Sequence, residues 1–319
     1  WEQIRWRIDV RDVRVTELTK HIAQTLWRQV AMDQDDQQRK RLIAWARSSE
    51  SASTIKNSIT LARGIPGVAV EPTGLDADPM LLNVENGTLD LALGDLRPHT
   101  PDDLITKLAP VRFEPLAEAP RWLGFLEQVQ PDPAVRAYLQ EFVGYCLTGI
   151  VTEHKMLMLI GGGRNGKTTF IDPIERLLGD YSRPAARDLL VQQKYEQHPT
   201  SLADLHGVRF APVVEIDAGD ALAEARLKSL TGGDRVKARR MREDFWHFDP
   251  SHKLLLAANH KPTVRGADEG IWRRIAVVPF EVTIPLTDVD PHLPGVLRAE
   301  ASGILNWALE GCSRWKASG

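Results

Sequence analysis

The sequence predicts an α/β fold in which a central parallel sheet carries a glycine-rich phosphate-binding loop. An apolar run at residues 156–160 is followed by the glycine-rich segment 161–166 and then by helical spacing of apolar residues over 169–178. Two further strands are predicted: residues 210–217, an apolar run that ends in carboxylates, and residues 253–258, which are followed by an amide side chain. A mainly helical region with a small β-hairpin unit is predicted before this sheet.

The N-terminal region, residues 1–63, has the apolar periodicity of helices. Three buried stripes are expected, formed by Leu18, Ile22 and Leu26, by Leu42 with Trp45, and by Ile55, Ile59 and Ala62. The dipeptide Asn86-Gly87 favours a tight hairpin, and Gly94-Asp95 predicts a second turn. Further along, residues 138–149 have apolar side chains on one helical face, which predicts a helix packed against a large core.

The segment between the first strand and its helix has the composition of a phosphate-binding loop. Glycines let backbone N–H groups surround phosphate oxygens at the N-terminus of a helix, where the helix dipole favours negative charge. Lys167 can reach the β and γ phosphates, and the Thr168 hydroxyl can bind Mg²⁺. The residues predicted to hold a nucleoside triphosphate are Gly161, Gly162, Gly163, Arg164, Asn165, Gly166, Lys167, Thr168 and Thr169.

Polar side chains at the ends of the other two strands complete the predicted catalytic site. Glu215 is the first candidate to orient or polarise the attacking water, and Asp217 is the first candidate to hold the metal. Alternate positions on a strand share a face, so both carboxylates are candidate metal ligands and the division of their roles stays open. Asn259 follows the third strand, and its amide can bond both the γ-phosphate and the water. In open α/β sheets ligands bind at the carboxyl ends of the strands, where all three sets fall.

The most basic stretch of the chain lies between the second and third of these strands. Residues 236–241 and 245–248 can pair as a hairpin. Its cations can grip DNA phosphates without reading sequence, and its aromatic rings can stack on exposed bases. The predicted DNA-binding residues are Lys237, Arg239, Arg240 and Arg242, and the candidate stacking residues are Phe245, Trp246 and His247. The alternative is a solvated edge hairpin whose aromatic rings pack inward.

Together these motifs resemble the superfamily 3 helicases, specifically the phage, plasmid and poxvirus primase-helicases. Residues 161–168 are similar to the Walker A loop of that family, and residues 215–217 to its Walker B end. The other matching segments are 230–234 before the channel hairpin, 256–262 as the sensor motif, 270–275 as the arginine-finger segment, 86–90 and 104–110 in the preceding small domain, and 303–311 as the following helix.

The resemblance implies an AAA-plus-like P-loop ATPase that uses ATP and Mg²⁺. It further implies a hexameric ring that moves 3′ to 5′ on single-stranded DNA in the replication of a phage, plasmid or other mobile element. Arg274 is the best placed candidate for an arginine finger acting on a neighbouring subunit, with Arg273 as the other candidate. For an isolated arginine pair, surface salt bridging is the default interpretation.

Two other functions remain open at the level of sequence. One is a nucleotide-gated assembly or origin-loading ATPase that does not unwind DNA processively, although such a scaffold needs no basic hairpin in its channel. The other is a small-molecule kinase, which needs an acceptor pocket and lid arginines on the same subunit.

The expected domains are a mainly helical region with a small β unit at 1–120, the ATPase at 121–290 and a helical segment at 291–319. The 319 residues are 43% hydrophobic and 26% charged, enough for one large core and a satellite domain. A formal charge of −3 excludes a uniformly basic surface, so DNA contact must be concentrated locally.

The two cysteines, Cys146 and Cys312, are expected to be buried free thiols in a reducing cytosol. We find no apolar run long enough to span a bilayer, so a soluble cytoplasmic protein of a bacterium or a phage-infected cell is expected. The chain begins at Trp1 without a methionine, which suggests a piece of a longer protein. The resemblance implies a primase or polymerase module upstream.

Overall fold

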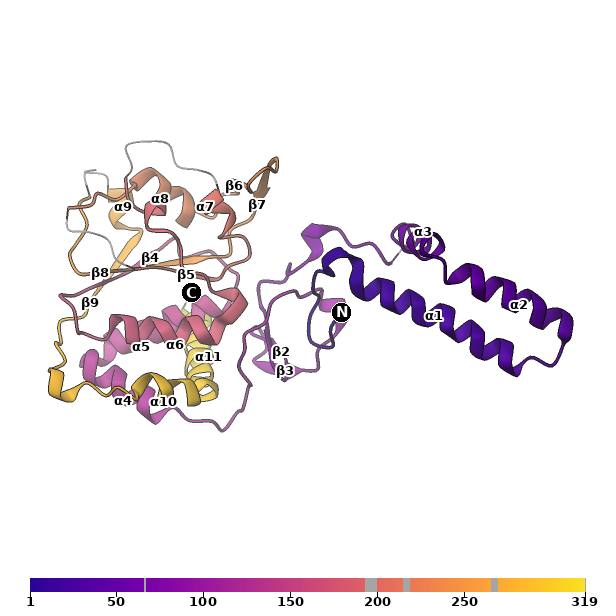
Figure 1. Cartoon of the computed structure of the whole chain (residues 1–319). Helices are drawn as coiled ribbons and strands as arrows, with labels where there is room; N and C mark the ends of the chain where they lie inside the picture. The colour runs from indigo at the N-terminus through magenta and orange to yellow at the C-terminus, as the bar shows by residue number, and fades with distance from the viewer. Residues whose placement is uncertain (66, 193–199, 215–218, 265–268, 319) are drawn as a thin grey trace. The chain divides into compact units, whose positions relative to one another are not determined.

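The computed structural model describes residues 1–65, 67–192, 200–214, 219–264 and 269–318 (Figure 1). The chain forms two compact units. The first contains Trp1–Glu2 and Trp6–Leu75, and the second contains Gln3–Arg5 and Asp76–Gly319. The domain boundaries expected near residues 120 and 290 stay predictions.

Three helices make up most of the first unit: α1 (Val13–Met32), α2 (Asp36–Ser49) and α3 (Ala52–Ala62), with 3₁₀ turns at Val10–Asp12 and Pro72–Gly74. Helix α1 packs against both α2 and α3. The Asp35 carboxylate accepts from the first backbone N–H groups of α2, and the Ser51 hydroxyl accepts from Thr54 N in α3, so both helices begin at a capping side chain. The N-terminal helical region is thereby confirmed.

The stripe predicted on the first helix is wrong in part. Leu26 is buried, but Leu18 and Ile22 are 61% and 67% exposed, and Trp45 of α2 is also exposed. The buried faces instead contain the small residues Ala23 and Ala46, which allow a close approach of the helices. Helix α1 carries apolar residues on more than one face, and its two neighbours cover only one of them.

The second unit opens with a three-stranded antiparallel sheet of β1 (Leu81–Val84), β2 (Gly87–Asp90) and β3 (Asp95–Arg97). The predicted hairpin is present, and its register pairs Val84 with Gly87, so Gly87 is the first strand residue rather than part of the turn. The Asn86 side chain bonds both the N–H and the carbonyl of Phe113, which fixes the turn to the segment that leads into the larger sheet.

A four-stranded parallel sheet lies at the centre of the second unit, in the order β5 (Phe210–Val214), β8 (Lys253–Ala258), β4 (Met156–Ile160) and β9 (Ile275–Pro279). The strands predicted at 156–160 and 253–258 are therefore confirmed, as is the central parallel sheet. Of the strand predicted at 210–217, residues 210–214 are confirmed and residues 215–217 lie outside the described residues. Because all these strands run the same way, their carboxyl ends meet at one edge.

Helices cover both faces of this sheet, as Figure 1 shows. Successive side chains of β4 alternate between two cores: Leu157 and Leu159 belong to one, and Met156 and Met158 to the other. The first core contains α4 (Pro120–Val129), α5 (Pro133–Leu147), α6 (Lys167–Leu178), α10 (Leu293–Ala299) and α11 (Ala301–Ser318). The second contains α8 (Glu224–Thr231) and the short helices α7 (Thr200–Ala203) and α9 (Glu269–Trp272).

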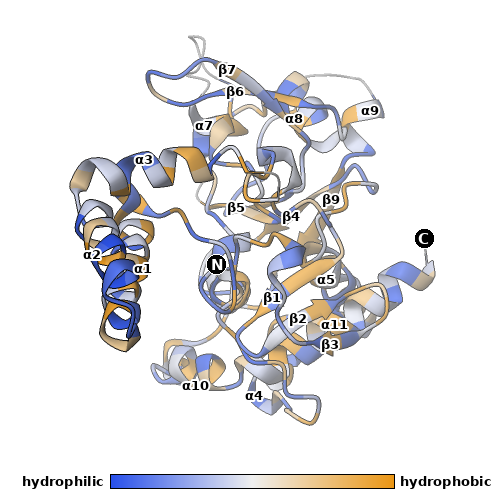
Figure 2. Ribbon diagram, turned by 90° about the vertical axis from the view of Figure 1, so that its right-hand side faces the viewer, coloured by the Kyte–Doolittle hydropathy of each residue, from blue (hydrophilic) through white to orange (hydrophobic). Residues whose placement is uncertain are grey.

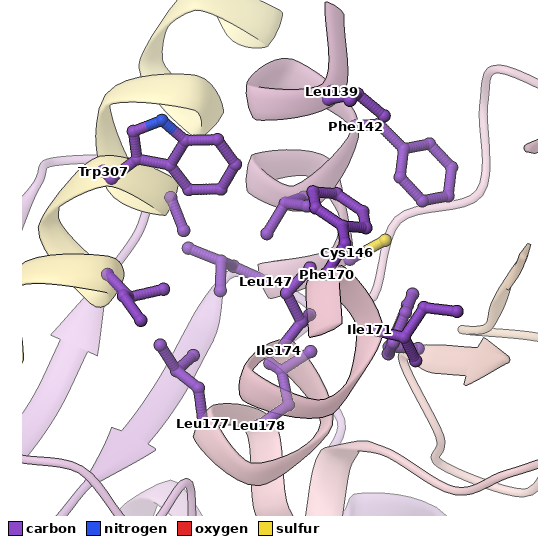
Figure 3. Close-up of a cluster of buried hydrophobic side chains, with 14 of the residues drawn as sticks. Leu139, Phe142, Cys146, Leu147, Phe170, Ile171, Ile174, Leu177, Leu178 and Trp307 are labelled. Atoms are coloured by element: carbon purple, nitrogen blue, oxygen red, sulfur yellow. The ribbon is translucent and has the colours of Figure 1, made fainter. Parts of the chain in front are cut away.

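The larger core surrounds the helix that begins at the glycine-rich loop. Phe170, near the start of α6, stacks on Trp122 with ring centroids 5.7 Å apart, and Trp122 meets Trp307 of α11 edge to face at 5.3 Å. Figure 3 shows other side chains of this core, with Leu147 of α5, Phe170 of α6 and Trp307 of α11 among those labelled. Cys146 and Cys312 are both buried free thiols, as predicted, and burial raises the pKa of Cys146 to about 12. No helix in the described part of the chain is both long and apolar enough to cross a bilayer.

Candidate functional site

The glycine-rich loop leaves the sheet at the carboxyl edge and enters α6. Gly161 N donates to Ala258 O at 3.2 Å, and Phe280 N donates to Ile160 O at 2.7 Å. These bonds fix the start of the loop between two neighbouring strands. The predicted order of strand, loop and helix is therefore confirmed, with α6 beginning at Lys167.

Two residues set the conformation of the loop. Gly166 has a φ of +86°, and a Cβ there would lie 2.7 Å from Val129 Cγ1, so a side chain is excluded by both backbone and space. The buried Asn165 side chain donates to Phe280 O at 3.0 Å, which ties the loop to the end of β9. Phe170 N then donates to Gly166 O at 2.8 Å and closes the first helical turn.

In the part of the chain that the structure describes, the Lys167 ammonium group bonds only neutral oxygens. Its Nζ donates to Gly161 O at 2.5 Å, to Asn165 Oδ1 at 3.1 Å and to Asn259 Oδ1 at 3.4 Å. The residue is 7% exposed, and this burial lowers the pKa of its ammonium group. Within the described residues no carboxylate pairs with it. A buried ammonium group next to a loop of backbone N–H groups can bind an anion.

The structure brings together some predicted site residues and leaves others undescribed. Lys167, Asn165 and Asn259 meet at the carboxyl edge, and Thr168 lies exposed in the first turn of α6. Glu215 and Asp217 lie outside the described residues. Over the described parts of the chain, no group of three or more histidine, cysteine or acidic side chains is positioned to hold a metal. The predicted metal ligands Thr168, Glu215 and Asp217 therefore stay predictions.

A cavity of about 420 Å³ borders the loop on the side of α4 and α10. Its lining includes Thr169 together with the apolar side chains of Phe125, Ile284 and Leu293. Ile284 N donates to Arg164 O at 2.8 Å, so the segment after β9 is fixed to the loop. The cavity is large enough for a nucleoside beside the anion-binding loop.

The basic stretch forms an antiparallel hairpin of β6 (Val236–Arg239) and β7 (Phe245–Phe248), as predicted. Its register pairs Val236 with Phe248, Ala238 with Trp246 and Arg239 with Phe245. Val236, Ala238 and Phe248 are buried, so the alternate residues face outward; these are Lys237, Arg239, Phe245 and His247.

The two faces of the hairpin carry different chemistry. On the outer face, Lys237 Nζ and Arg239 Cζ lie 4.7 and 5.4 Å from the centroid of the Phe245 ring, which is half exposed. On the inner face, the rings of Trp246 and His206 pack with their centroids 4.7 Å apart, and Arg240 Cζ lies 5.4 Å from the centroid of the Trp246 ring. The cations predicted as one grip are therefore divided, and Trp246 is unable to stack on a base.

Arg242 lies in the turn of the hairpin with a φ of +64°. Figure 2 shows this turn in the blue of hydrophilic residues. The solvated-hairpin alternative is thus correct for the inner aromatic residues, which pack on the body, but the outer face exposes cations beside an aromatic ring.

Two protein families match the chain. The family described as "D5 N terminal like" matches residues 1–131, and the family described as "Family of unknown function (DUF5906)" matches residues 159–274. The second match extends from the end of β4 to Arg274 and so contains the loop, the hairpin and Asn259.

Viral proteins with replication names are similar to both regions together. "Putative helicase L207/L206" of Acanthamoeba polyphaga mimivirus is 32% identical over 237 residues, covering 72% of this chain and 24% of that protein. "Putative primase C962R" of African swine fever virus (isolate Tick/Malawi/Lil 20-1/1983) is 26% identical over 210 residues, covering 63% of this chain and 22% of that protein. The chain belongs to the phage and viral primase-helicase family.

This primase-helicase chain spans about a quarter of the length of those viral relatives. Its fold is also similar to the solved structure described as "The A form apo structure of NrS-1 C terminal region-CTR". The TM-score is 0.51 with 14% sequence identity, and the match covers 62% of this chain and 47% of that one.

The arginine pair of this primase-helicase chain lies at the edge of the sheet opposite the loop. Met156 N donates to Arg274 O at 2.7 Å, so Arg274 lies at the amino end of β4. The length of that strand, about 15 Å at the usual rise per residue, separates it from the loop of its own subunit. The Arg274 guanidinium donates to Thr231 Oγ1 at 3.1 Å, whereas Arg273 forms an exposed ion pair with Glu269 at 3.2 Å.

A cavity of about 460 Å³ opens beside these arginines, with His154 and Lys228 on its lining. His154 Nδ1 lies 2.9 Å from Thr231 O, so the same threonine holds both His154 and Arg274. Neither the support of Arg274 by Thr231 nor the anchoring of the loop by Asn165 could be found in the sequence, because each depends on a contact between distant segments.

Proposed function

We propose that this chain is the ATP-hydrolysing motor of a superfamily 3 replication helicase that acts on single-stranded DNA. The observation that carries the proposal is the Lys167 ammonium group. It is buried at the carboxyl edge of a parallel sheet, bonded to neutral oxygens, at the start of a helix that follows a glycine-rich loop. This arrangement fits the β and γ phosphates of ATP and supports the assignment of the loop as a P-loop in an AAA-plus-like ATPase.

The nucleotide is proposed to lie along the loop, with its phosphates on the backbone of residues 161–169. Its base and ribose occupy the cavity lined by Phe125, Ile284 and Leu293. Thr168 and Asp217, with Glu215, are the residues that would hold Mg²⁺, an assignment supported by the exposed position of Thr168 at the start of α6. When bound, the metal neutralises charge on the phosphate oxygens.

The catalytic residues act at the same edge of the sheet. Glu215 orients the attacking water, and Asn259 bonds the γ-phosphate or that water. The existing contact between Asn259 Oδ1 and Lys167 Nζ supports this proposal, because it brings the amide to the position that the γ-phosphate would reach. Glu215→Gln is expected to retain ATP binding and to lose about 10²-fold or more in the rate of hydrolysis. If Asp217→Asn is inactive and Glu215→Gln hydrolyses ATP at a nearly normal rate, the roles of the two carboxylates are exchanged.

The outer face of the hairpin is proposed to grip the DNA. Lys237 and Arg239 contact phosphates, Phe245 stacks on a base, and Arg242 at the tip adds a further phosphate contact. The exposure of Lys237, Arg242 and Phe245 supports this, with Arg239 partly exposed beside them. The contact of Lys237 and Arg239 with the Phe245 ring also supports it, because it limits the freedom of both cations before DNA binds. Arg240 faces the body of the unit instead.

The active assembly is proposed to be a homo-oligomeric ring, with a hexamer as the expected form, acting in the cytoplasm on the DNA of a phage or mobile element. Arg274 lies about one strand length from its own loop. An arginine in that position can stabilise the γ-phosphate charge of a neighbouring subunit but not that of its own.

The first test is the ATP turnover of Lys167→Ala compared with the wild type. Loss of the charge that faces the transferred phosphate is expected to reduce the rate by at least about 10²-fold. Lys155→Ala removes an exposed lysine just before β4 and serves as the matched control. Near-normal turnover in Lys167→Ala would overturn the nucleotide assignment.

A further inference from the structure

An open cavity of about 590 Å³ lies in the second unit beneath the inner face of the hairpin. Its lining brings together side chains from four separate segments of the chain. The charged and titratable members are Lys107, Arg183, Asp204, His206 and Arg240. Three of these are permanent or nearly permanent cations, and only one is a carboxylate.

Lys107 is a cation without a partner on the lining of this cavity. Among the described residues, its Nζ forms no hydrogen bond and no ion pair, and burial lowers the pKa of its ammonium group. The charges of Asp76 and Asp180 act on Lys107 and partly offset the effect of burial, but neither carboxylate bonds it: Asp76 accepts from Thr106 N at 2.7 Å, and Asp180 forms an ion pair with Arg5. The lysine stem also passes close to Gly207, where a Cβ would lie 2.7 Å from Lys107 Cε and the φ is +67°.

The other charges around the cavity do not neutralise it. Asp204 forms an ion pair with Arg183 at 2.8 Å. Arg240 reaches Glu243 only at 3.9 Å, with both side chains more than half exposed, so this pair is weak. Among the described residues of the lining, cations therefore outnumber carboxylates by three to one. His206 stays neutral more readily than an ordinary histidine, since burial, Lys107 and Arg240 all lower its pKa.

The hairpin register directs Arg240 toward this cavity. Residues 236 and 238 face inward and are buried, so residue 240 continues the same face, and its guanidinium lies 5.4 Å from the Trp246 ring. Trp246 and Phe248 in turn contact the His206 ring at 4.7 and 5.3 Å. The lining thus combines a cation of the hairpin with cations of the body.

We propose that this cavity binds a phosphate group, and that the phosphate belongs to the backbone of a single DNA strand carried by the hairpin. A phosphate has enough acceptor oxygens to bond a lysine and two arginines that approach from different segments. The cavity is open and far larger than one phosphate ion, which favours a passing strand over a free ion. The assignment to DNA rests on the proposed function, whereas the phosphate site itself does not.

The first experiment measures binding of a fluorescent oligothymidylate to the full chain over a range of salt concentrations. Lys107→Gln is expected to weaken binding about tenfold, as for loss of one charge-assisted contact, and to reduce the salt slope by about 0.7. Arg240→Gln, an exposed position, is expected to act in the same way and covers the case that Lys107→Gln fails to fold. Lys56→Gln removes an exposed lysine of the first unit and is the control.

Asp204→Asn tests the same site in the opposite direction. It removes the carboxylate that competes for Arg183, so oligothymidylate affinity is expected to rise a few-fold, by roughly the strength of a surface ion pair. Weaker binding in this variant would contradict the proposal, because the carboxylate would then be a contributor to the site.

The second experiment titrates the full chain with inorganic phosphate and follows the ring-proton resonance of His206, assigned with His206→Gln. The resonance is expected to shift in the wild type and not in Lys107→Gln. If phosphate shifts the His206 resonance but Lys107→Gln and Arg240→Gln bind DNA like the wild type, the phosphate site is retained and its assignment to a DNA strand is overturned. No response to phosphate, with an unchanged salt slope in Lys107→Gln and Arg240→Gln, would overturn the proposal. Neither readout needs ATP turnover, so failure of the proposed hydrolysis would be seen separately.

Discussion

Buried cations have two different roles among the residues of this chain. Arg209 donates to the carbonyls of Leu147 and Leu81 and lies 4.4 Å from the centre of the Tyr181 ring. Lys253 donates to Thr148 O and to Ser251 O. Both are satisfied by backbone oxygens and serve the fold. Lys107 instead lines an open cavity, and Lys167 bonds the side-chain amides of Asn165 and Asn259 beside the glycine-rich loop, which is why we assign these two lysines to ligands.

The buried ammonium of Lys253 gives stability a dependence on pH. Burial lowers its pKa to about 7, while in the unfolded chain it titrates near its ordinary value. The folded chain therefore binds fewer protons than the unfolded chain above about pH 7, and stability rises with pH, by at most about 1.4 kcal/mol for each pH unit. Below about pH 7 this contribution no longer changes.

We expect the free energy of unfolding of the wild type, measured with urea, to rise relative to Lys253→Met between about pH 7 and pH 9. Above about pH 9 the Cys146 thiol acts in the opposite sense, because its raised pKa keeps a proton in the folded chain. A constant difference between the two proteins over this range would show that Lys253 titrates normally.

Within the loop, two glycines offer a matched pair. Gly166 has positive φ and no room for a Cβ, whereas Gly162 has open space around it and no positive φ. Gly166→Ala is expected to cost about 1–3 kcal/mol of stability and Gly162→Ala much less. Thermal unfolding measures the difference. Equal effects would mean that the loop relaxes around residue 166 without strain.

At the scale of elements, the sequence predicts the two strands of the hairpin but not the face on which each of its cations lies. Its first arm is predictable because residues 236–239 alternate between apolar and polar with the period of a strand, and its second arm because the aromatic residues at 245–248 favour strands. The division of its cations is not, because register decides which of Lys237, Arg239 and Arg240 share a face. The cavity beneath it joins residues 107, 183, 206 and 240, and no local pattern connects positions that far apart.

The central parallel sheet, in contrast, is predicted well by the sequence. The strands at 156–160 and 253–258 begin and end where predicted, because parallel strands buried on both faces are continuous apolar runs. Helix α1 shows why amphipathic patterns are weaker signals: Leu18 and Ile22 have the correct spacing but lie outside the buried face. The catalytic assignments of Glu215 and Asp217 fall outside the described residues and stay predictions.

The outer face of the hairpin can be tested apart from its inner face. The double variant Lys237→Ala with Arg239→Ala is expected to reduce the salt slope of single-stranded DNA binding by about 1.4, from two phosphate contacts. Basal ATP turnover should stay near that of the wild type. The double variant Arg112→Ala with Lys155→Ala removes equal charge from exposed positions and should bind DNA normally. An unchanged slope in the hairpin variant would make the outer face a solvated surface.

At the scale of the whole molecule, the position of Arg274 gives the proposed ring a testable consequence. Arg274→Ala should bind ATP normally and lose roughly 10³-fold in turnover if the arginine acts on a neighbouring subunit. Mixing it with Lys167→Ala should restore part of the activity, because some interfaces then combine an intact loop with an intact arginine. Arg273→Ala is the control. No recovery in rings that exchange subunits would exclude Arg274 as the finger.

The central claim is that the nucleotide loop drives work on single-stranded DNA, and the most direct test is the steady-state ATPase rate with and without single-stranded DNA, measured alongside the molar mass in solution. We predict a rate that DNA stimulates in a multimeric wild type and that Lys167→Ala abolishes in both conditions. Turnover that survives in Lys167→Ala, or a rate that is identical with and without DNA in an assembled ring, would contradict the account.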